Sequence, residues 1–198
     1  MIKNQKLKEY FNNDKKEYVV LYDPTSNKTP EQTGLWSVTG LLSKLIVKDG
    51  LLCAYCNKNG TNFYPLRNDD TKNFQIKMQT YQASYGAYQL VRFHFLNKDG
   101  NEIANFRQET FSITVSKNGE KIASLSLDYD TRFCCQNFRV EKINNSLYLY
   151  AKGNNTEYVE PTLRYSISLD EQIESLYITV AVASVGNFYI KYMEYKEW

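Results

Sequence analysis

The sequence predicts an all-β fold, an antiparallel two-sheet jelly-roll sandwich of about twelve strands with a short N-terminal arm or helix. Seventeen tyrosines and ten phenylalanines, together with many threonine, valine and isoleucine residues, favour strands over helices. After residue 17, apolar and polar residues alternate in short segments that are separated by turns rich in glycine and asparagine. Short strands between frequent turns are typical of a sandwich or a barrel.

The first half of the chain supplies several strands and one loop. EYVVLYD (17–23) is predicted to be a strand, and DPTSNKTPEQTG (23–34), with two prolines and a glycine, is predicted to be a loop. Asp49-Gly50 favours a tight hairpin turn, because it supplies positive backbone angles. NFQIKMQTY (73–81) alternates as a half-buried strand does. Trp36 is expected in the core.

The second half continues the alternation. Val91, Phe93 and Phe95 are predicted to face the core, and Tyr88, Arg92 and His94 share the opposite face. Hairpins are expected at 97–102, 117–120 and Asn144-Asn145. In the strand after the last of these, Leu147 and Leu149 are predicted on one face and Tyr148 and Tyr150 on the other. DEQIES (170–175) is predicted to be either a single helical turn or a charged, solvated loop, and GNFYIKYMEY (186–195) a terminal strand.

Charge and hydropathy exclude several functions. The net charge of +2 is scattered along the chain, whereas a nucleic-acid binder would carry a basic patch. No apolar run approaches the roughly 18 residues of a membrane span, so no membrane insertion is expected. The start lacks the apolar core of a signal peptide, which predicts synthesis in the host cytoplasm. Residues 1–17 are either a frayed end or an arm that docks on another subunit, and residues 18–198 form one sandwich domain.

Four cysteines raise the question of a metal. Cys53 and Cys56 have the spacing of half a zinc site, and Cys134 and Cys135 lie farther along. Adjacent residues in a strand point to opposite faces, so reduced, mostly buried thiols are favoured over a four-thiolate zinc site. Asp128 and Asp130 lack the ligand density of a calcium loop. Neither a metal nor a cofactor is therefore expected.

Nucleophilic catalysis also finds little support. His94 is the only histidine, and its position within a predicted strand favours a structural role over a Ser-His or Cys-His pair. The glycine-rich phosphate-binding motifs are missing. The chain is therefore predicted not to be an enzyme.

A family resemblance rests on the order of several segments. Gly34-Leu35-Trp36 is followed by LIVKDGLLCAYC, NFQIKMQ and VRFHFLNKDGNEI, and GNFYIKYMEY closes the chain. This arrangement resembles the jelly rolls of concanavalin A-like lectins and laminarinases. The resemblance implies a concave sheet of six or seven strands, lined with aromatic and polar residues that bind glycans. The enzymatic members have a Glu-x-Asp-x-x-Glu strand, which this sequence lacks.

The candidate binding residues follow from these faces. Tyrosine suits both sugar stacking and protein interfaces, and a histidine and an arginine lie nearby. The alternative is that a tyrosine-rich sheet simply exposes some of its rings. The predicted carbohydrate- or partner-binding residues are Tyr81, Tyr85, Tyr88, Arg92, His94, Tyr148 and Tyr150.

The predicted function combines the fold with the expected synthesis in the cytoplasm. We expect a non-catalytic bacteriophage virion protein, in a tail, fibre or head decoration, whose lectin-like sandwich contacts host-surface carbohydrate. Its partners would be other virion subunits or copies of itself in a symmetric oligomer. The alternatives are a free-standing carbohydrate-binding module and a glycoside hydrolase.

Overall fold

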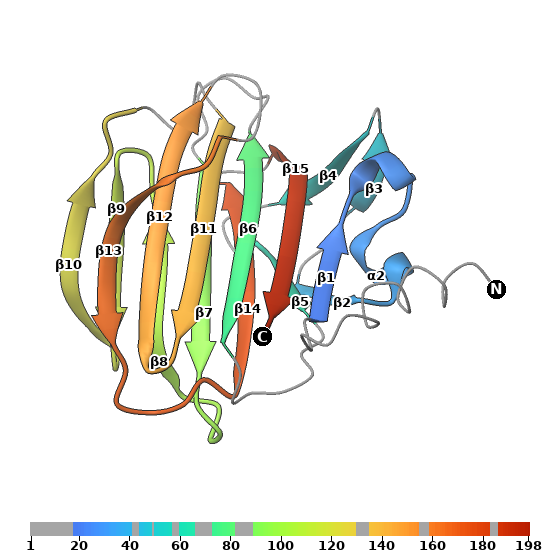
Figure 1. Ribbon diagram of the computed structural model, residues 1–198. Coiled ribbons are helices and arrows are strands. Elements are labelled where there is room, and N and C mark those ends of the chain that lie inside the picture. The colour runs from blue at the N-terminus through green and yellow to red at the C-terminus, as the bar shows by residue number, and fades with distance from the viewer. Residues whose placement is uncertain are drawn as a thin grey trace.

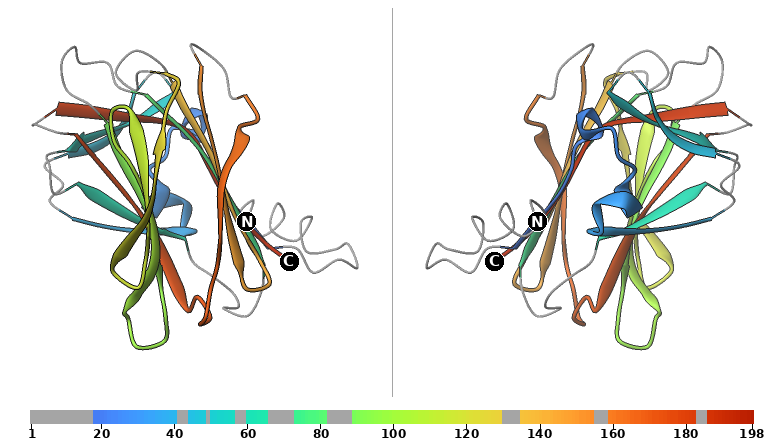
Figure 2. Two further views of the ribbon diagram at one scale, coloured as in Figure 1. Left: turned by 90° about the vertical axis from the view of Figure 1, so that its left-hand side faces the viewer. Right: turned by 90° about the vertical axis from the view of Figure 1, so that its right-hand side faces the viewer.

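The protein is a sandwich of two antiparallel sheets packed face to face (Figures 1 and 2). The computed structural model describes residues 18–40, 44–48, 50–56, 60–65, 73–81, 89–129, 135–154, 159–182 and 186–198. The predicted all-β sandwich is confirmed, with fifteen strands in this part of the chain instead of about twelve. The predicted arm at 1–17 lies outside the described residues.

The larger sheet has eight strands and includes the end of the chain. β1 (Tyr18–Tyr22) pairs with the C-terminal half of the last strand, β15, whereas β4 pairs with its N-terminal half. The other seven strands lie in the order β13 (Thr162–Ser168), β12 (Ser146–Asn154), β11 (Cys135–Ile143), β6 (Phe74–Tyr81), β15 (Gly186–Glu197), β4 (Leu51–Cys56) and β3 (Lys44–Lys48).

The smaller sheet has seven strands, and consecutive hairpins build half of it. Figure 1 shows β7, β8 and β9 behind the larger sheet. The order is β10 (Glu120–Ser126), β9 (Ser112–Lys117), β8 (Glu102–Gln108), β7 (Gln89–Leu96), β14 (Ser175–Val182), β5 (Thr61–Pro65) and β2 (Trp36–Gly40).

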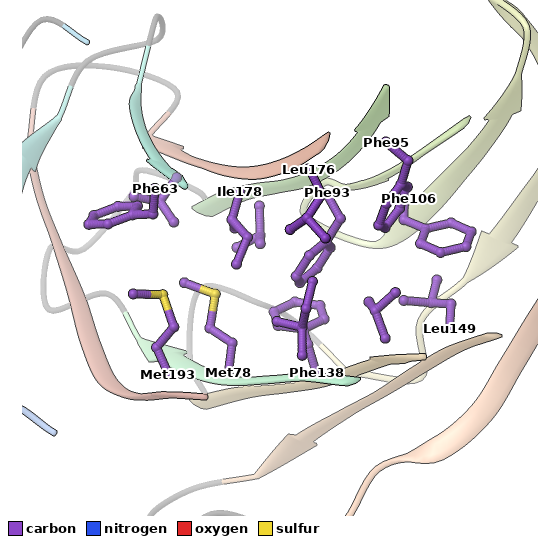
Figure 3. Close-up of a cluster of buried hydrophobic side chains, with 14 of the residues drawn as sticks. Phe63, Met78, Phe93, Phe95, Phe106, Phe138, Leu149, Leu176, Ile178 and Met193 are labelled. Carbon is purple, nitrogen blue, oxygen red and sulfur yellow. The ribbon is translucent and has the colours of Figure 1, made fainter. Parts of the chain in front are cut away.

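The core lies between the sheets because each strand alternates apolar and polar residues. Figure 3 shows Phe93 and Ile178 of the smaller sheet pointing toward Phe138 and Met193 of the larger one. The rings of Phe93 and Phe138 meet edge to face, with their centroids 5.5 Å apart. Trp36 is buried, as predicted.

The segment predicted to be a proline-containing loop contains two short helical pieces. These are η1 (Pro24–Ser26) and α2 (Pro30–Thr33), and each begins with a proline, whose fixed backbone angle suits a first helical position. Thr29 and Gln32 form a capping box at the start of α2. No helix in the described part of the chain is long and apolar enough to cross a membrane.

Of the two alternatives for 170–175, the helical turn is wrong and a loop is present. Residues 169–174 are an irregular connection, and β14 begins at Ser175. Ile173 is fully buried in the core, and the Glu174 N–H donates to the Leu96 carbonyl at 2.8 Å. The buried isoleucine and this hydrogen bond hold the segment against the sheet, so its backbone groups are not paired as in a helix.

The predicted turns occur where the backbone needs a positive φ. Asn118-Gly119 has φ values of +50° and +82°, as the tight turn between β9 and β10 requires. Asn144 has a φ of +52° between β11 and β12. Gly50 has a φ of +71°, whereas Asp49 lies outside the described residues.

Candidate functional site

The outer face of the seven-stranded sheet contains a hollow of about 400 Å³. Alternation produces this face: in β7, Val91 and Phe93 point into the core, which leaves Arg92 and His94 on the outside. Four neighbouring strands contribute to it, namely β8, β7, β14 and β5. We call this pocket the hollow; it is lined by Asn62, Leu90, Arg92, His94, Arg107, Tyr177, Thr179 and Ala181.

A β-bulge in β8 brings a carboxylate to the edge of this site. Phe95 pairs with Ala104, but the next residue, Leu96, pairs with Glu102. The extra residue, Ile103, is buried in the core. The bulge therefore places Glu102 on the outer face beside His94, where an unbroken ladder would have placed Ile103.

Glu102 is the centre of a hydrogen-bond network. Its Oε2 lies 2.5 Å from His94 Nδ1, and its Oε1 accepts from Arg92 Nη2 at 2.8 Å and from Asn105 Nδ2 at 2.6 Å. Burial alone would raise the pKa of Glu102, but the hydrogen bond with His94 and the charge of Arg92 outweigh it. The pKa therefore lies below its usual value, and Glu102 is a carboxylate at neutral pH.

His94 connects this network to the floor of the hollow. Its Nε2 lies 2.9 Å from Thr179 Oγ1, which lies 2.7 Å from Asn62 Oδ1. Burial lowers the pKa of His94, and the charge of Arg92 acts in the same direction, while Glu102 opposes both. Since Thr179 has one hydroxyl proton, it can donate either to a neutral His94 or to Asn62. The direction of hydrogen bonding across the hollow therefore depends on the protonation of His94.

An aromatic stack crosses the same face. The rings of His94 and Tyr177 lie 4.1 Å apart and 10° from parallel, and Tyr64 stacks on Tyr177 at 5.0 Å. Both faces of Tyr177 are therefore covered, so this residue presents its edge and its hydroxyl to the hollow. The outer member, Tyr64, hydrogen-bonds Thr39 at 3.4 Å.

The residues predicted to bind a ligand do not form a single site. Arg92 and His94 lie on the outer face of the seven-stranded sheet, whereas Tyr81, Tyr148 and Tyr150 belong to strands of the other sheet. Tyr81 stacks on Tyr189 at 4.8 Å, and Arg139 lies 3.7 Å from the centre of the Tyr150 ring. Arg92 and His94 therefore do not share a surface with Tyr81, Tyr148 and Tyr150. Tyr85 and Tyr88 lie outside the described residues.

Several residues around the hollow were not predicted. Alternation in TNFYP and LYITV already placed Asn62 with Tyr64, and Tyr177 with Thr179, on the polar faces of their strands. The missing information was that β5, β14 and β7 are neighbours, because strands distant in sequence make these pairs. Nothing in the sequence pattern marked the bulge that exposes Glu102.

The two cysteines whose side chains the structure describes, Cys53 and Cys135, do not lie together. Cys53 is in β4 and Cys135 in β11, and β15 and β6 lie between those strands. Strands are spaced about 4.8 Å apart, which separates the two by roughly 14 Å, far more than two thiolates bound to one zinc ion at about 2.3 Å allow. These two residues therefore cannot share a metal, and Cys134 lies outside the described part of the chain.

Asp128, considered for calcium, is exposed and pairs with Arg164 Nη2 at 3.1 Å. Its proposed companion, Asp130, lies outside the described residues. Within the described part of the chain, no three histidine, cysteine or acidic side chains cluster so that they could hold a metal ion.

Comparison with known proteins identifies the fold. No family model matches the chain, and no curated protein matches it in sequence. Among solved structures, the lumenal domain of VIP36 in its Ca²⁺/Man2-bound form is 12% identical, with a TM-score of 0.61 over 88% of this chain and 86% of that one. The CBM2 module of the evolved Dit of Lactobacillus casei BL23 phage J-1 is 13% identical, with a TM-score of 0.59 over 91% of this chain and 96% of that one.

A third similar structure is an enzyme. The xylan beta-1,4-xylosidase from Bacillus halodurans C-125 is 11% identical, with a TM-score of 0.60 over 90% of this chain but only 39% of the enzyme. Together these likenesses show that this chain has the β-sandwich fold of concanavalin A-like lectins and glucanases.

Proposed function

We propose that this protein binds carbohydrate in the hollow on the outer face of its seven-stranded sheet and does not cleave it. The observation that carries the proposal is a set of polar side chains held in fixed positions around a pocket. Hydrogen bonds join Asn62 to Thr179 and Thr179 to His94. Glu102 holds His94 in place through a further hydrogen bond. Groups fixed before binding lose little freedom when a ligand arrives, which favours recognition of a polar molecule.

The chemistry of the hollow suits a sugar. A saccharide presents many hydroxyl groups, which need both donors and acceptors. Asn62 and Thr179 supply both kinds, Tyr177 offers its hydroxyl, and Arg92 offers donors. The carbohydrate-related neighbours support this assignment, since one VIP36 structure contains Man2 and the phage module is named as a CBM2.

The arrangement of carboxylates supports binding without hydrolysis. Most glycoside hydrolases place two carboxyl groups on either side of the scissile bond, about 5–10 Å apart. Among the described residues that line the hollow, none is acidic. Glu102 lies at the edge of the hollow and is already bonded to Arg92, His94 and Asn105. The xylosidase likeness covers 39% of that enzyme, which leaves most of the enzyme without a counterpart here.

The proposal is tested by binding to a panel of bacterial surface polysaccharides with a matched pair of variants. Tyr177→Ala removes a hydroxyl and ring edge from the hollow, so it should weaken binding about tenfold or more. Tyr148→Ala alters a half-buried tyrosine of the other sheet and should leave binding unchanged. Circular dichroism establishes that both variants are folded.

Two outcomes would count against this function. Equal loss of binding in the two tyrosine variants would remove the hollow as the site. Release of reducing sugar from a bound polysaccharide would show hydrolysis and would contradict the non-catalytic assignment.

A role in a bacteriophage virion is the second part of the proposal. Its support is the phage Dit module, whose chain is matched over 96% of its length. In that role the sandwich would display the hollow toward host-surface carbohydrate while other surfaces contact virion subunits or further copies of the chain. Light scattering at micromolar concentration should then give the mass of a symmetric oligomer. A monomer at every concentration would favour a free-standing carbohydrate-binding module.

A further inference from the structure

Two arginines line the hollow and face each other across neighbouring strands. Arg92 of β7 is paired directly with Arg107 of β8. Like charges opposite each other in a sheet repel, and each guanidinium is offset by one carboxylate. Those carboxylates, Glu102 and Glu109, do not belong to the lining of the hollow. The charged side chains among the described lining residues are therefore cationic.

Both arginines have donors without a partner among the described residues. Arg92 donates through Nη2 to Glu102 at 2.8 Å, and its buried Nε has no hydrogen-bond partner. Arg107 contacts Glu109 through Nε at 3.1 Å, and its side chain is 48% exposed. A guanidinium has five N–H donors in a planar fork. Since each arginine has one carboxylate contact in the described part of the chain, donors of both remain for a ligand.

We infer that the carbohydrate bound in the hollow bears an anionic group that is held between Arg92 and Arg107. This inference rests on the proposed function and specifies the class of its ligand. An anion there would accept hydrogen bonds from both guanidiniums and relieve their mutual repulsion. A neutral sugar would leave the two cations opposed and would exclude water from part of their charge without adding a further negative group.

The anionic group has oxygens in a geometry that matches the guanidinium fork. A uronic acid supplies a carboxylate, and a substituted sugar supplies a sulfate or phosphate ester. These share the same recognition chemistry, namely negatively charged oxygens that accept paired N–H donors. The experiment therefore needs separate arms for them.

Matched polysaccharides separate charge from sugar shape. Acidic bacterial capsular polysaccharides are titrated by calorimetry beside the same polymers after carboxyl reduction, and dextran sulfate beside dextran. We expect an acidic polymer to bind about tenfold or more tightly than its neutral counterpart, as one or two charge-assisted hydrogen bonds require. Loss on carboxyl reduction identifies a uronic acid, whereas preference for dextran sulfate identifies an ester. Binding should also weaken as salt is raised.

A pair of arginine variants locates the effect. Arg107→Gln keeps a polar, uncharged side chain but removes the positive charge at a half-exposed position. It should lower affinity for the acidic polymer about tenfold while sparing any weak binding of the neutral one. Arg164→Gln is the control, because Arg164 also pairs with one carboxylate but lies in the other sheet. The control should keep the wild-type preference.

The outcomes distinguish this inference from the proposed function. Equal binding of acidic and neutral polymers, or an undiminished acidic preference in Arg107→Gln, would overturn the inference and leave carbohydrate binding standing. Failure to bind any polymer of either kind by the folded wild type would overturn the proposed function itself.

Discussion

Glu102 organises the candidate site because it is the acceptor for three side chains at once. Its bonds to His94, Arg92 and Asn105 fix the positions of groups from β7 and β8. His94 in turn hydrogen-bonds Thr179 in β14 and so fixes the position of its hydroxyl group. A single carboxylate therefore determines how the donors and acceptors around the hollow are presented.

Removal of that charge should be costly. Glu102→Gln leaves Arg92 without its carboxylate and replaces one acceptor oxygen by an amide nitrogen that cannot accept from Arg92 or His94. We expect the free energy of unfolding to fall by about 1–2 kcal/mol, because a partly buried acceptor of three hydrogen bonds is lost. Urea denaturation measures the change. Glu120→Gln, at a fully exposed position in β10, is the control and should have little effect.

His94 and Glu102 also predict how stability depends on pH. The pKa of His94 is lowered from 6.5 in the folded protein, so the unfolded chain binds more protons as the pH falls below that value. The pKa of Glu102 is lowered from 4.5, which acts with the same sign in a more acidic range. The free energy of unfolding should therefore decrease on acidification from pH 6.5.

The contribution of His94 can be isolated by substitution. Relative to the wild type, His94→Gln should show a flatter decline of unfolding free energy just below pH 6.5, where the lowered pKa of His94 acts. Urea denaturation across this range provides the comparison. A wild type that becomes more stable as the pH falls below 6.5 would contradict the assignment.

At the scale of strands, alternation predicted on which face of its strand each residue lies, but not to which sheet the strand belongs. The pattern correctly placed Phe93 inside and His94 outside, and it also placed Tyr148 opposite Leu149. It could not show that β7 and β12 belong to different sheets, because alternation is a local property and strand pairing is not. The hollow therefore required the structure, even though most of its residues were recognisable as outward-facing.

Two connecting segments differ from the structure that their sequence suggested, each for a physical reason. The loop at 23–34 became partly helical because Pro24 and Pro30 occupy first helical positions and the capping residues follow them. The charged segment at 170–175 looked helical, but the burial of Ile173 decides its path. Burial of one side chain depends on the whole sandwich and leaves no mark in a six-residue pattern.

Close packing of strands beneath the hollow predicts a sensitive glycine. Gly60 has a φ of +74°, and a Cβ added there would lie 2.7 Å from the Val180 carbonyl oxygen and 2.8 Å from Thr179 Cγ2. Gly60→Ala should therefore lower the free energy of unfolding by about 2 kcal/mol or more and displace Thr179. Gly100→Ala is a matched control, since Gly100 has a φ of +77° but no atom near the added Cβ.

Thermal unfolding of the two glycine variants separates backbone strain from crowding. Both substitutions place an alanine at an unfavourable positive φ, whereas only Gly60→Ala also brings the new Cβ against the β14 backbone. Equal losses of stability would mean that β5 and β14 do not approach as closely as described.

At the scale of the molecule, the two sheets depend on a shared aromatic core. Phe93 and Phe138 come from opposite sheets and meet edge to face. Each single change to alanine should cost about 3–5 kcal/mol. A double-mutant cycle using leucine replacements, which keep the protein folded, should give a coupling of about 0.5–1.5 kcal/mol. Additive effects would show that the rings do not interact across the core.

The central claim is that carbohydrate binds on the outer face of the seven-stranded sheet, and nuclear magnetic resonance tests it most directly. The ¹⁵N-labelled protein is titrated with an oligosaccharide prepared from a bound polysaccharide, and backbone amide shifts are followed. We predict the largest changes at Asn62, Arg92 and Thr179, with little change at Tyr148 and Tyr150. Changes centred on Tyr148 and Tyr150, or no change with any saccharide, would contradict the account.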